Sequence, residues 1–270
     1  MNTRNVRAHG VTPSLSQDYV KRTATHQAAF ILPFLHSGMN LLDVGCGPGT
    51  ITMGLAQVAA PGQVIGVDHD WQHIEMARKL ALENEVDNIT FQNGDALSLP
   101  FDDNTFDAAF ENNVFVHLSE NAGIAAGEVF RVLKPHGLFA ARDADADSVV
   151  WGNSTDSLKQ FDKLFIAWHR SRGSDITLGK QLPTILRQAG FVDMIKSVSA
   201  DTKGSPKDTR AHAEITISLL DGPFGKKILK NGWADKSTIE RWKTDFQEWS
   251  EHPDSFFANI HVEVVGWKPA

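Results

Sequence analysis

The sequence predicts an α/β protein built on a parallel sheet with helices on both faces. Two observations support this fold class. Apolar segments of strand length alternate with amphipathic segments of helix length from residue 39 to residue 142, and such alternation is typical of a parallel sheet covered by helices. In addition, the first strand is joined to the first helix by a loop with glycine at every second position. Such a loop lets backbone N–H groups approach a ligand closely.

Each element of the predicted core follows from its local sequence. The strands are short runs of mainly apolar residues at Met39–Val44, Gln63–Val67, Ile89–Gln92, Phe106–Phe110 and Leu138–Arg142. One amphipathic helix follows the glycine loop directly, with apolar residues at helical spacing from Ile51. A second helix is predicted from about residue 71 to 85 with Asp70 as its N-cap, and a third from 120 to 133, ended by Pro135.

The pattern changes after Asp143, where we expect two helical cap insertions, at about 147–175 and 200–255. A helix at 179–189 and strands at Phe191–Val198 and Ile260–Val265 complete a main domain of residues 38–270. Residues 1–37 are predicted as an N-terminal helical lid, because apolar residues recur at helical spacing from residue 14, with a kink at Pro33.

Composition and charge exclude several classes of partner. The net charge of −7 argues against a basic nucleic-acid surface and against a polybasic membrane patch. No apolar run approaches the roughly 18 residues of a membrane-spanning helix, and the first ten residues lack the apolar core of a signal peptide. Cys46 is the only cysteine, so neither a disulfide framework nor a thiolate metal cluster is expected. We therefore expect a cytoplasmic protein that holds no metal.

The glycine loop, residues 42–50, does not fit two common phosphate-binding motifs. A P-loop ends in Gly-Lys-Ser/Thr, and this loop has no lysine. A dinucleotide fingerprint needs glycine or alanine where this chain has Thr50, and Gly49 comes one residue too early. The spacing of Gly45, Gly47 and Gly49 after Asp43 resembles motif I of the class I S-adenosylmethionine (SAM) methyltransferases.

Further motifs follow the loop at fixed distances and strengthen this resemblance. Asp68 ends the second strand 19 residues after Gly49, close to the roughly 20 residues usual for a carboxylate that accepts from ribose hydroxyls. Gly94-Asp95-Ala96 follows the third strand, and Arg131-Val132-Leu133-Lys134-Pro135 lies at the end of the third helix. Taken alone, Asp95 is an ordinary turn residue. In this combination it is similar to the adenine-binding acid of the SAM methyltransferases, especially the ubiquinone/menaquinone-biosynthesis type.

The resemblance implies a Rossmann-like, seven-stranded, mostly parallel sheet whose last strand is antiparallel, with SAM as the cofactor. It also implies a set of cofactor-binding residues: Asp43, Gly45, Gly47 and Gly49 around the methionine moiety, Asp68 at the ribose, His69 and His73 beside the adenine, Asp95 and Ala96 at the adenine edge, Glu111 and Asn112 near the methyl group, and Tyr19 at the methionine head. The family often has Gly-Gly where this chain has His136-Gly137, and His136 favours a type I turn over a type II turn.

Methyl transfer is an in-line displacement, so the protein must align the two reactants, exclude water and, for some acceptors, remove a proton. His117 after the fourth strand, His26 on the N-terminal helix and Asp143 after the fifth strand are the candidate catalytic residues. Two of them, His117 and Asp143, also have a structural interpretation. His117 can pack under the helix that follows it, and the acidic run at 143–147 can be a solvated turn.

The sequence therefore predicts an enzyme that transfers the methyl group of SAM to a small-molecule acceptor, with S-adenosylhomocysteine as product. The alternative is a SAM-binding protein with a non-methylating role, either other chemistry in the pocket or service as a non-catalytic partner subunit. An NAD-dependent oxidoreductase is disfavoured by Thr50 and by the motif around Asp95. The sequence leaves open the identity of the substrate, the acceptor atom and the oligomeric state.

Overall fold

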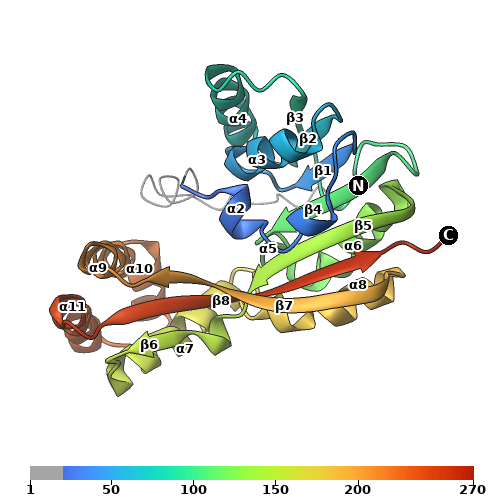
Figure 1. Ribbon diagram of the computed structural model, residues 1–270. Helices are drawn as coiled ribbons and strands as arrows, with labels where there is room; N and C mark the ends of the chain where they lie inside the picture. The colour runs from blue at the N-terminus through green and yellow to red at the C-terminus, as the bar shows by residue number, and fades with distance from the viewer. Residues whose placement is uncertain (1–20) are drawn as a thin grey trace.

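The computed structural model describes residues 21–270, and its centre is an eight-stranded sheet (Figure 1). Five neighbouring strands are parallel to one another. In spatial order they are β3 (Ile89–Asn93), β2 (Val64–Asp68), β1 (Leu41–Val44), β4 (Phe106–Asn112) and β5 (Leu133–Ala144). The next strand, β8 (Phe256–Trp267), is antiparallel to β5, and β7 (Val192–Lys203) is antiparallel to β8. This confirms the predicted fold class.

Two clusters of buried apolar side chains bring helices onto both faces of this sheet. One cluster joins the strands to α6 (Ala122–Val132) and α8 (Leu182–Ala189). The other joins them to α2 (Ala24–Gln27) and α3 (Thr50–Ala59). A smaller cluster packs α4 (Trp71–Glu83) on the β2–β3 side, and Asp70 caps α4 as predicted, its side chain accepting from the N–H of Gln72. The remaining short elements are α5 (Phe115–Leu118), η1 (Leu32–Phe34), η2 (Ser119–Asn121), η3 (Ala146–Ser148) and η4 (Leu178–Gln181).

The helical insertions form a cap with a hydrophobic core of its own. The cap consists of α7 (Asp156–Arg170), α9 (Pro206–Asp221), α10 (Pro223–Lys230) and α11 (Lys236–Glu251). Its core includes the fully buried side chains of Trp242, Phe246 and Phe224. Figure 1 shows these helices at the far end of the long strands β7 and β8, away from β1–β4. The strands β7 and β8 therefore extend beyond the main sheet and connect it to the cap.

Several elements differ from the sequence-based expectation. The structure adds an eighth strand, β6 (Val150–Gly152), which pairs with the first residues of β8 inside the predicted helical insertion. β7 continues to Lys203, so the second insertion begins with a strand. Within residues 21–37 the predicted lid helix is reduced to α2, which ends at Gln27, and to η1, which contains Pro33 in its first turn. Proline has no N–H for an α-helical hydrogen bond, so the chain does not continue as α-helix through Pro33. The helix α6 ends at Val132, and Leu133 already belongs to β5.

The turn at His136 also corrects the prediction. His136 has φ 65° and therefore adopts the left-handed conformation that a type I turn does not contain. Its backbone N–H donates to the carbonyl of Lys268, and the Lys268 N–H donates to the carbonyl of Gly137. Pairing with the end of the chain fixes this turn and outweighs the conformational preference of a non-glycine residue.

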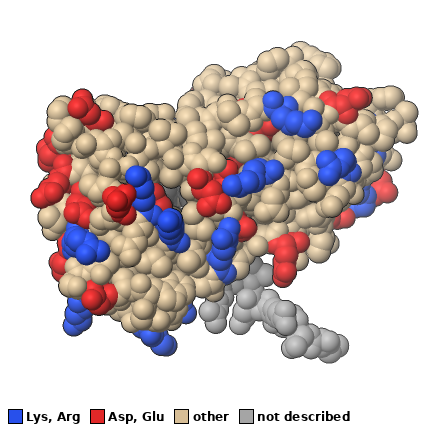
Figure 2. Space-filling view, turned by 90° about the horizontal axis from the view of Figure 1, so that it is seen from below, with Lys and Arg blue, Asp and Glu red and all other residues tan. Residues whose placement is uncertain are grey.

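Charged side chains are distributed over the molecule without a dominant patch on the face seen in Figure 2, where acidic and basic groups are interspersed. Among residues 21–270, no helix is long and apolar enough to cross a membrane.

Candidate active site

A single cavity of about 1130 Å³ reaches from the glycine loop to the cap. It is lined by most residues that the sequence assigned to the cofactor, together with one of the three catalytic candidates: Asp43, Gly45, Gly47, Asp68, His69, His73, Asp95, Ala96, Asn112 and His117. Gly49, Glu111, Asp143 and His26 are not among its lining residues. Tyr19 lies outside the residues that the structure describes.

The three glycine positions of the loop require glycine for different structural reasons. All three have positive φ (70°, 53° and 79° for Gly45, Gly47 and Gly49), which favours glycine at each position. A Cβ on Gly45 would lie 2.3 Å from a Val114 methyl, and one on Gly49 would lie 2.5 Å from the Phe91 ring. A Cβ on Gly47 would meet no protein atom within 4 Å and would project into open space. Gly45 and Gly49 therefore allow close packing, while Gly47 leaves room beside the loop.

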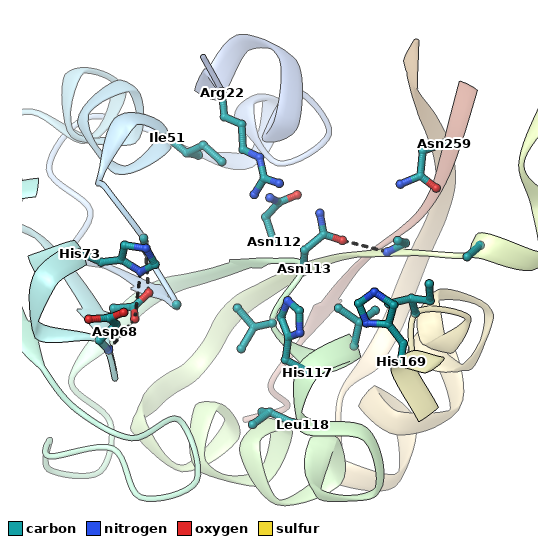
Figure 3. A pocket seen from close by; sticks show the side chains of 18 of the residues that line it. Arg22, Ile51, Asp68, His73, Asn112, Asn113, His117, Leu118, His169 and Asn259 are labelled. Carbon is teal, nitrogen blue, oxygen red and sulfur yellow. Dashed lines mark hydrogen bonds and ion pairs between the residues drawn. The ribbon is translucent and has the colours of Figure 1, made fainter. Parts of the chain in front are cut away.

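Asp68 connects the loop to the end of β2. Its carboxylate accepts the N–H of Gly47 and the N–H of Asp70, each at 2.9 Å. The Nδ1 atoms of His69 and His73 lie 3.4 and 3.6 Å from the same oxygen, and Figure 3 shows His73 turned toward Asp68. Burial alone would raise the pKa of Asp68, but these hydrogen bonds outweigh it and hold the pKa well below its usual range. Asp68 is therefore a fixed negative charge at the cavity wall.

The same contacts that lower the pKa of Asp68 raise the pKa of the two histidines. The hydrogen bond to Asp68 raises the pKa of both His69 and His73, although burial opposes the shift. Further along the wall, Asp95 accepts the N–H of Leu97 at 2.9 Å, so its carboxylate is part of a tight turn and also lines the cavity. The structural and the ligand-binding interpretations of Asp95 are thus compatible.

Asp43 is buried behind the glycine loop, with only 2% of its surface exposed. The hydroxyl of Thr52 donates to its carboxylate at 2.6 Å. Burial raises the pKa of Asp43 to about 7, partly offset by this hydrogen bond and reinforced by the nearby charge of Asp68. A positively charged group bound in the cavity would favour the ionised form of Asp43.

Glu111 and Asp143 form a buried acidic pair beneath the cavity floor. Glu111 accepts the backbone N–H groups of Arg142 and Val114, both at 3.0 Å, and Asp143 accepts the N–H of Val116 at 3.1 Å. Burial raises the pKa of both carboxyl groups, and the two interact directly. Because neither side chain reaches the cavity, the geometry gives Asp143 no direct contact with a substrate, and Glu111 fixes the segment after β4.

His26 is also displaced from the expected position. Its Nε2 lies 3.3 Å from a carboxylate oxygen of Asp201 on β7, and its side chain is 58% exposed. His26 therefore contacts β7 and is not among the residues that line the cavity, so the catalytic role expected for it has no geometric support. The neighbouring Lys21 and Arg22 do line the cavity.

A buried arginine network was missed by sequence reasoning. Arg142 is fully buried and donates to Asn112 and Asp201 at 2.8 Å and to Ser199 at 3.0 Å. It thereby fixes the side chain of Asn112 at the cavity wall. Charged residues are rarely buried in strands, and Arg142 follows an apolar run with no local signal of its partners on β7, which come from distant parts of the chain.

Asn113 is a second residue that the sequence did not single out. It has φ 58°, and its side-chain oxygen accepts the N–H of Ala144 at 3.0 Å. Its amide lies 3.3 Å from Nε2 of His261, whose pKa burial lowers to about 4. In Figure 3, Asp68 lies toward one side of the cavity and His169 toward the other, with Asn113 and His117 between them.

The cap supplies the other half of the cavity wall. The residues it contributes are mainly aromatic and aliphatic: Trp151, Phe161, Phe165, Ile166, Ile215, Leu219 and Phe257. Polar groups among them include Asp162, His169 and His212. Within residues 21–270, no group of three or more His, Cys, Asp or Glu side chains could hold a metal ion.

Three features define an α/β protein that binds a nucleoside cofactor. They are a glycine loop between a strand and a helix, a fixed carboxylate at the end of the next strand, and an acidic turn after the third strand. Residues 35–190 match the methyltransferase domain family Methyltransf_31. The chain therefore belongs to the class I SAM-dependent methyltransferases, and SAM is its cofactor. The residues present fit this cofactor, because the space beside Gly47 is open and Asp68 presents an ionised carboxylate to it.

Comparison with individual proteins agrees with this family. The chain is 34% identical over 269 residues to the uncharacterized methyltransferase C1B3.06c of Schizosaccharomyces pombe, covering 96% of this chain and 95% of that protein. It is 40% identical over 109 residues to the demethylmenaquinone methyltransferase of Symbiobacterium thermophilum, covering 40% and 43%. Among solved structures, the [4+2]-cyclase SpnF has a similar fold, with a TM-score of 0.54, 23% identity and coverage of 95% and 81%.

Proposed function

We propose that this enzyme transfers the methyl group of SAM to a small, largely apolar acceptor, with S-adenosylhomocysteine as the second product. The observation that carries the proposal is the continuous cavity. One wall is formed by the glycine loop, Asp68 and Asp95, and the other by aromatic side chains of the cap. Its volume of about 1130 Å³ exceeds the roughly 300–1,000 Å³ that a single drug-sized ligand occupies. The cavity therefore has room for a cofactor and an acceptor.

The bound cofactor supplies an activated methyl group, so the protein's task is to position the two molecules and to exclude water. Asp68 is placed to accept from the ribose hydroxyls, with His69, His73, Asp95 and Ala96 at the nucleoside end. Asn112, whose side chain accepts a hydrogen bond from Arg142, would lie near the methyl-transfer position. The cap would cover this position together with Lys21 and Arg22, which line the cavity; residues 1–20 of the lid expected at 1–37 lie outside the part of the chain that the structure describes.

His117 is the residue we propose as general base for an acceptor that loses a proton. It lies at the cavity wall between the cofactor end and the cap, and Figure 3 shows its ring directed into the same space as that of His169. Histidine is the side chain that most often acts as a general base. Asp143 and His26 are not proposed for this role, because their side chains do not line the cavity.

We further propose that the acceptor is not a nucleic acid and that the enzyme acts in the cytoplasm. The net charge of −7 and the interspersed charges in Figure 2 support a small uncharged or weakly charged acceptor rather than a polyanion. The single cysteine supports a reducing compartment.

The test is a methyl-transfer assay with SAM and a panel of small apolar acceptors, with mass spectrometry of both products. We expect S-adenosylhomocysteine and a methylated acceptor in equal amounts. Replacement of His117 by Gln should lower the rate about 100-fold for a hydroxyl acceptor, with S-adenosylhomocysteine affinity unchanged within a few-fold. A protein that binds S-adenosylhomocysteine tightly but methylates no member of the panel would contradict the proposal.

One comparison supports a second candidate function. The similar fold of SpnF belongs to a protein named as a [4+2]-cyclase, so the fold alone does not specify methyl transfer. A SAM-binding chain with a non-methylating role, or one that serves as a partner subunit, would hold the cofactor and leave it intact. Recovery of unchanged SAM from an acceptor that is nevertheless transformed would support this second function.

A further inference from the structure

Asp162 is an ionisable group on the cap side of the cavity that methyl transfer does not use. It lies on α7 and lines the cavity. One carboxylate oxygen accepts the indole N–H of Trp151, on β6, at 2.7 Å. Within the described part of the chain, this indole is the only hydrogen-bond partner of Asp162. A carboxylate has about four acceptor positions, so most of its capacity to accept hydrogen bonds is unused.

The surroundings of Asp162 are unfavourable for an ionised carboxylate. Burial raises the pKa of Asp162 to about 7, although the hydrogen bond from Trp151 acts in the opposite direction. Phe161, Phe165 and Ile166 on the same helix line the cavity beside it. A polar group in such surroundings is destabilising unless a partner satisfies it.

Holding Trp151 in place does not account for this carboxylate. The Trp151 ring already packs against Trp249, Phe257 and Phe246, with ring centroids 5.0, 4.6 and 6.0 Å away. These contacts fix the ring without a charge, and a neutral acceptor would satisfy one indole N–H equally well. The position of Asp162 at the cavity wall therefore points to contact with a ligand rather than to support of Trp151.

Asp162 lies on α7, and none of the residues assigned to the cofactor belongs to this helix. A second hollow of about 450 Å³ adjoins the cavity, and Trp151, Asp162 and Ile166 line both. None of the residues that line this hollow belongs to the glycine loop. A group that contacts Asp162 thus belongs to the end of the acceptor that points away from the methyl group.

We propose that Asp162 anchors the acceptor by accepting a hydrogen bond from a hydroxyl group on a largely apolar ring system. The inference rests on the proposed methyl transfer and adds the class of acceptor. The aromatic walls pack against the rings, the carboxylate fixes their orientation, and the opposite end of the molecule is presented to the methyl group.

The charges around Asp162 favour a hydroxyl over a cationic amine. Arg172 and Lys203 line the cavity as well, so acids are not in excess on the cap side. The other acid there, Asp208, is engaged by the hydroxyl and the backbone N–H of Ser205 in a capping box. A cation would meet one carboxylate among basic neighbours, whereas a neutral donor meets no such opposition.

The test measures binding by calorimetry to the full chain saturated with S-adenosylhomocysteine. The probes are 2-naphthol, the size-matched 2-methylnaphthalene and the cationic 2-(aminomethyl)naphthalene. We expect 2-naphthol to bind about 10- to 100-fold more tightly than 2-methylnaphthalene. Asp162→Leu should abolish this preference, and Asp162→Asn, which keeps the size and one acceptor oxygen, should reduce it to a few-fold.

Two control variants separate anchoring from a structural role. Asp156→Asn changes an exposed acid on the same helix and should keep the full preference. Trp151→Phe removes the indole N–H and should also keep it, because Asp162 remains. If Asp162→Leu retains the preference, if Trp151→Phe loses it as well, or if the amine binds best, the proposal is wrong. Loss of S-adenosylhomocysteine binding or of methyl transfer would instead contradict the proposed function, and is measured separately.

Discussion

At the scale of single residues, Asp68 shows how one carboxylate organises a binding site. Two backbone N–H groups and two histidines converge on it, so its charge is fixed before any ligand arrives. Preorganisation of this kind removes part of the entropic penalty of binding. The opposite situation holds for Asp43 and Glu111, whose burial without a cation raises their pKa.

Replacement of Asp68 by Asn should weaken S-adenosylhomocysteine binding by about 1.5–3 kcal/mol, the range for a hydrogen bond to a charged group. Calorimetry on the purified variant measures the change. Asp87→Asn, an exposed acid outside the cavity, serves as the matched control and should bind normally. Unchanged affinity in a folded Asp68→Asn variant would remove Asp68 from the cofactor site.

We expect the carboxylate of Asp68 to determine the pKa of His73 in the ligand-free protein. Because Asp68 stabilises the imidazolium, the pKa of His73 should lie above its usual 6.5. The pair therefore stabilises the fold fully below pH 6.5, and this contribution is lost as the pH rises through the raised pKa of His73. NMR titration of the imidazole measures this pKa, and Asp68→Asn should lower it. An equal pKa in both proteins would disprove the coupling.

Substitution of His136 should change the stability of the protein and leave ligand binding unaffected. A non-glycine residue with φ 65° is strained, so His136→Gly should raise the free energy of unfolding by about 0.5–1 kcal/mol, the released strain less the greater freedom of the unfolded chain. Chemical denaturation measures the difference. His136→Ala keeps a Cβ at the same φ and should give no gain; a gain equal to that of glycine would show that strain is not the cause.

At the scale of elements, the loop between β1 and α3 combines two requirements that the sequence alone does not separate. Its glycines look equivalent in the sequence, but Gly45 and Gly49 lie against Val114 and Phe91, whereas Gly47 lies beside open space. Packing and ligand binding therefore depend on different glycines of one motif.

Gly47→Ala and Gly49→Ala should consequently have different effects. In Gly47→Ala the new Cβ meets no protein atom but takes the place of the ligand, so we expect a folded protein, destabilised by about 1–2 kcal/mol, that no longer binds SAM. In Gly49→Ala the Cβ collides with Phe91 and Ala77, so the fold itself should be lost or strongly destabilised. Thermal denaturation and calorimetry on both proteins test this, and normal SAM binding by Gly47→Ala would contradict it.

At the scale of the whole molecule, the main sheet and the cap have separate hydrophobic cores connected by β7 and β8. Two strands of twelve residues each run from one core to the other, and the cavity lies where the two parts meet. We therefore expect cofactor binding and acceptor choice to depend on different parts of the chain.

A defect confined to the cap core should therefore separate the two functions. Ile228 is fully buried in α10 and does not line the cavity, so Ile228→Ala should destabilise the cap by about 2–5 kcal/mol. We expect methyl transfer to fall strongly and S-adenosylhomocysteine affinity to change only a few-fold. Ile124→Ala on α6, where the side chain is 54% exposed, is the control. Parallel loss of both functions would show that the two parts are not independent.

The sequence by itself determined the order of strands and helices in the parallel part of the sheet, the glycine loop and the cofactor, and it predicted the residues at the nucleoside end. These features are local, because hydrophobic periodicity, turn residues and motif spacing are read within short segments of the chain. Asp68 and Asp95 could be assigned because each directly follows a strand of the parallel sheet, whose carboxyl edge is where ligands bind.

Only the tertiary structure decided which predicted side chains meet in the cavity. His26 contacts Asp201 and Asp143 is buried against Glu111, so neither side chain lines the cavity, and both contacts join residues that are distant in the chain. Asn113 and Arg142 are held by partners on β8 and β7, and the packing of the cap brings Asp162 to the cavity wall; no local pattern indicates either. Burial and long-range pairing set the electrostatics of a site, and both depend on how the chain packs.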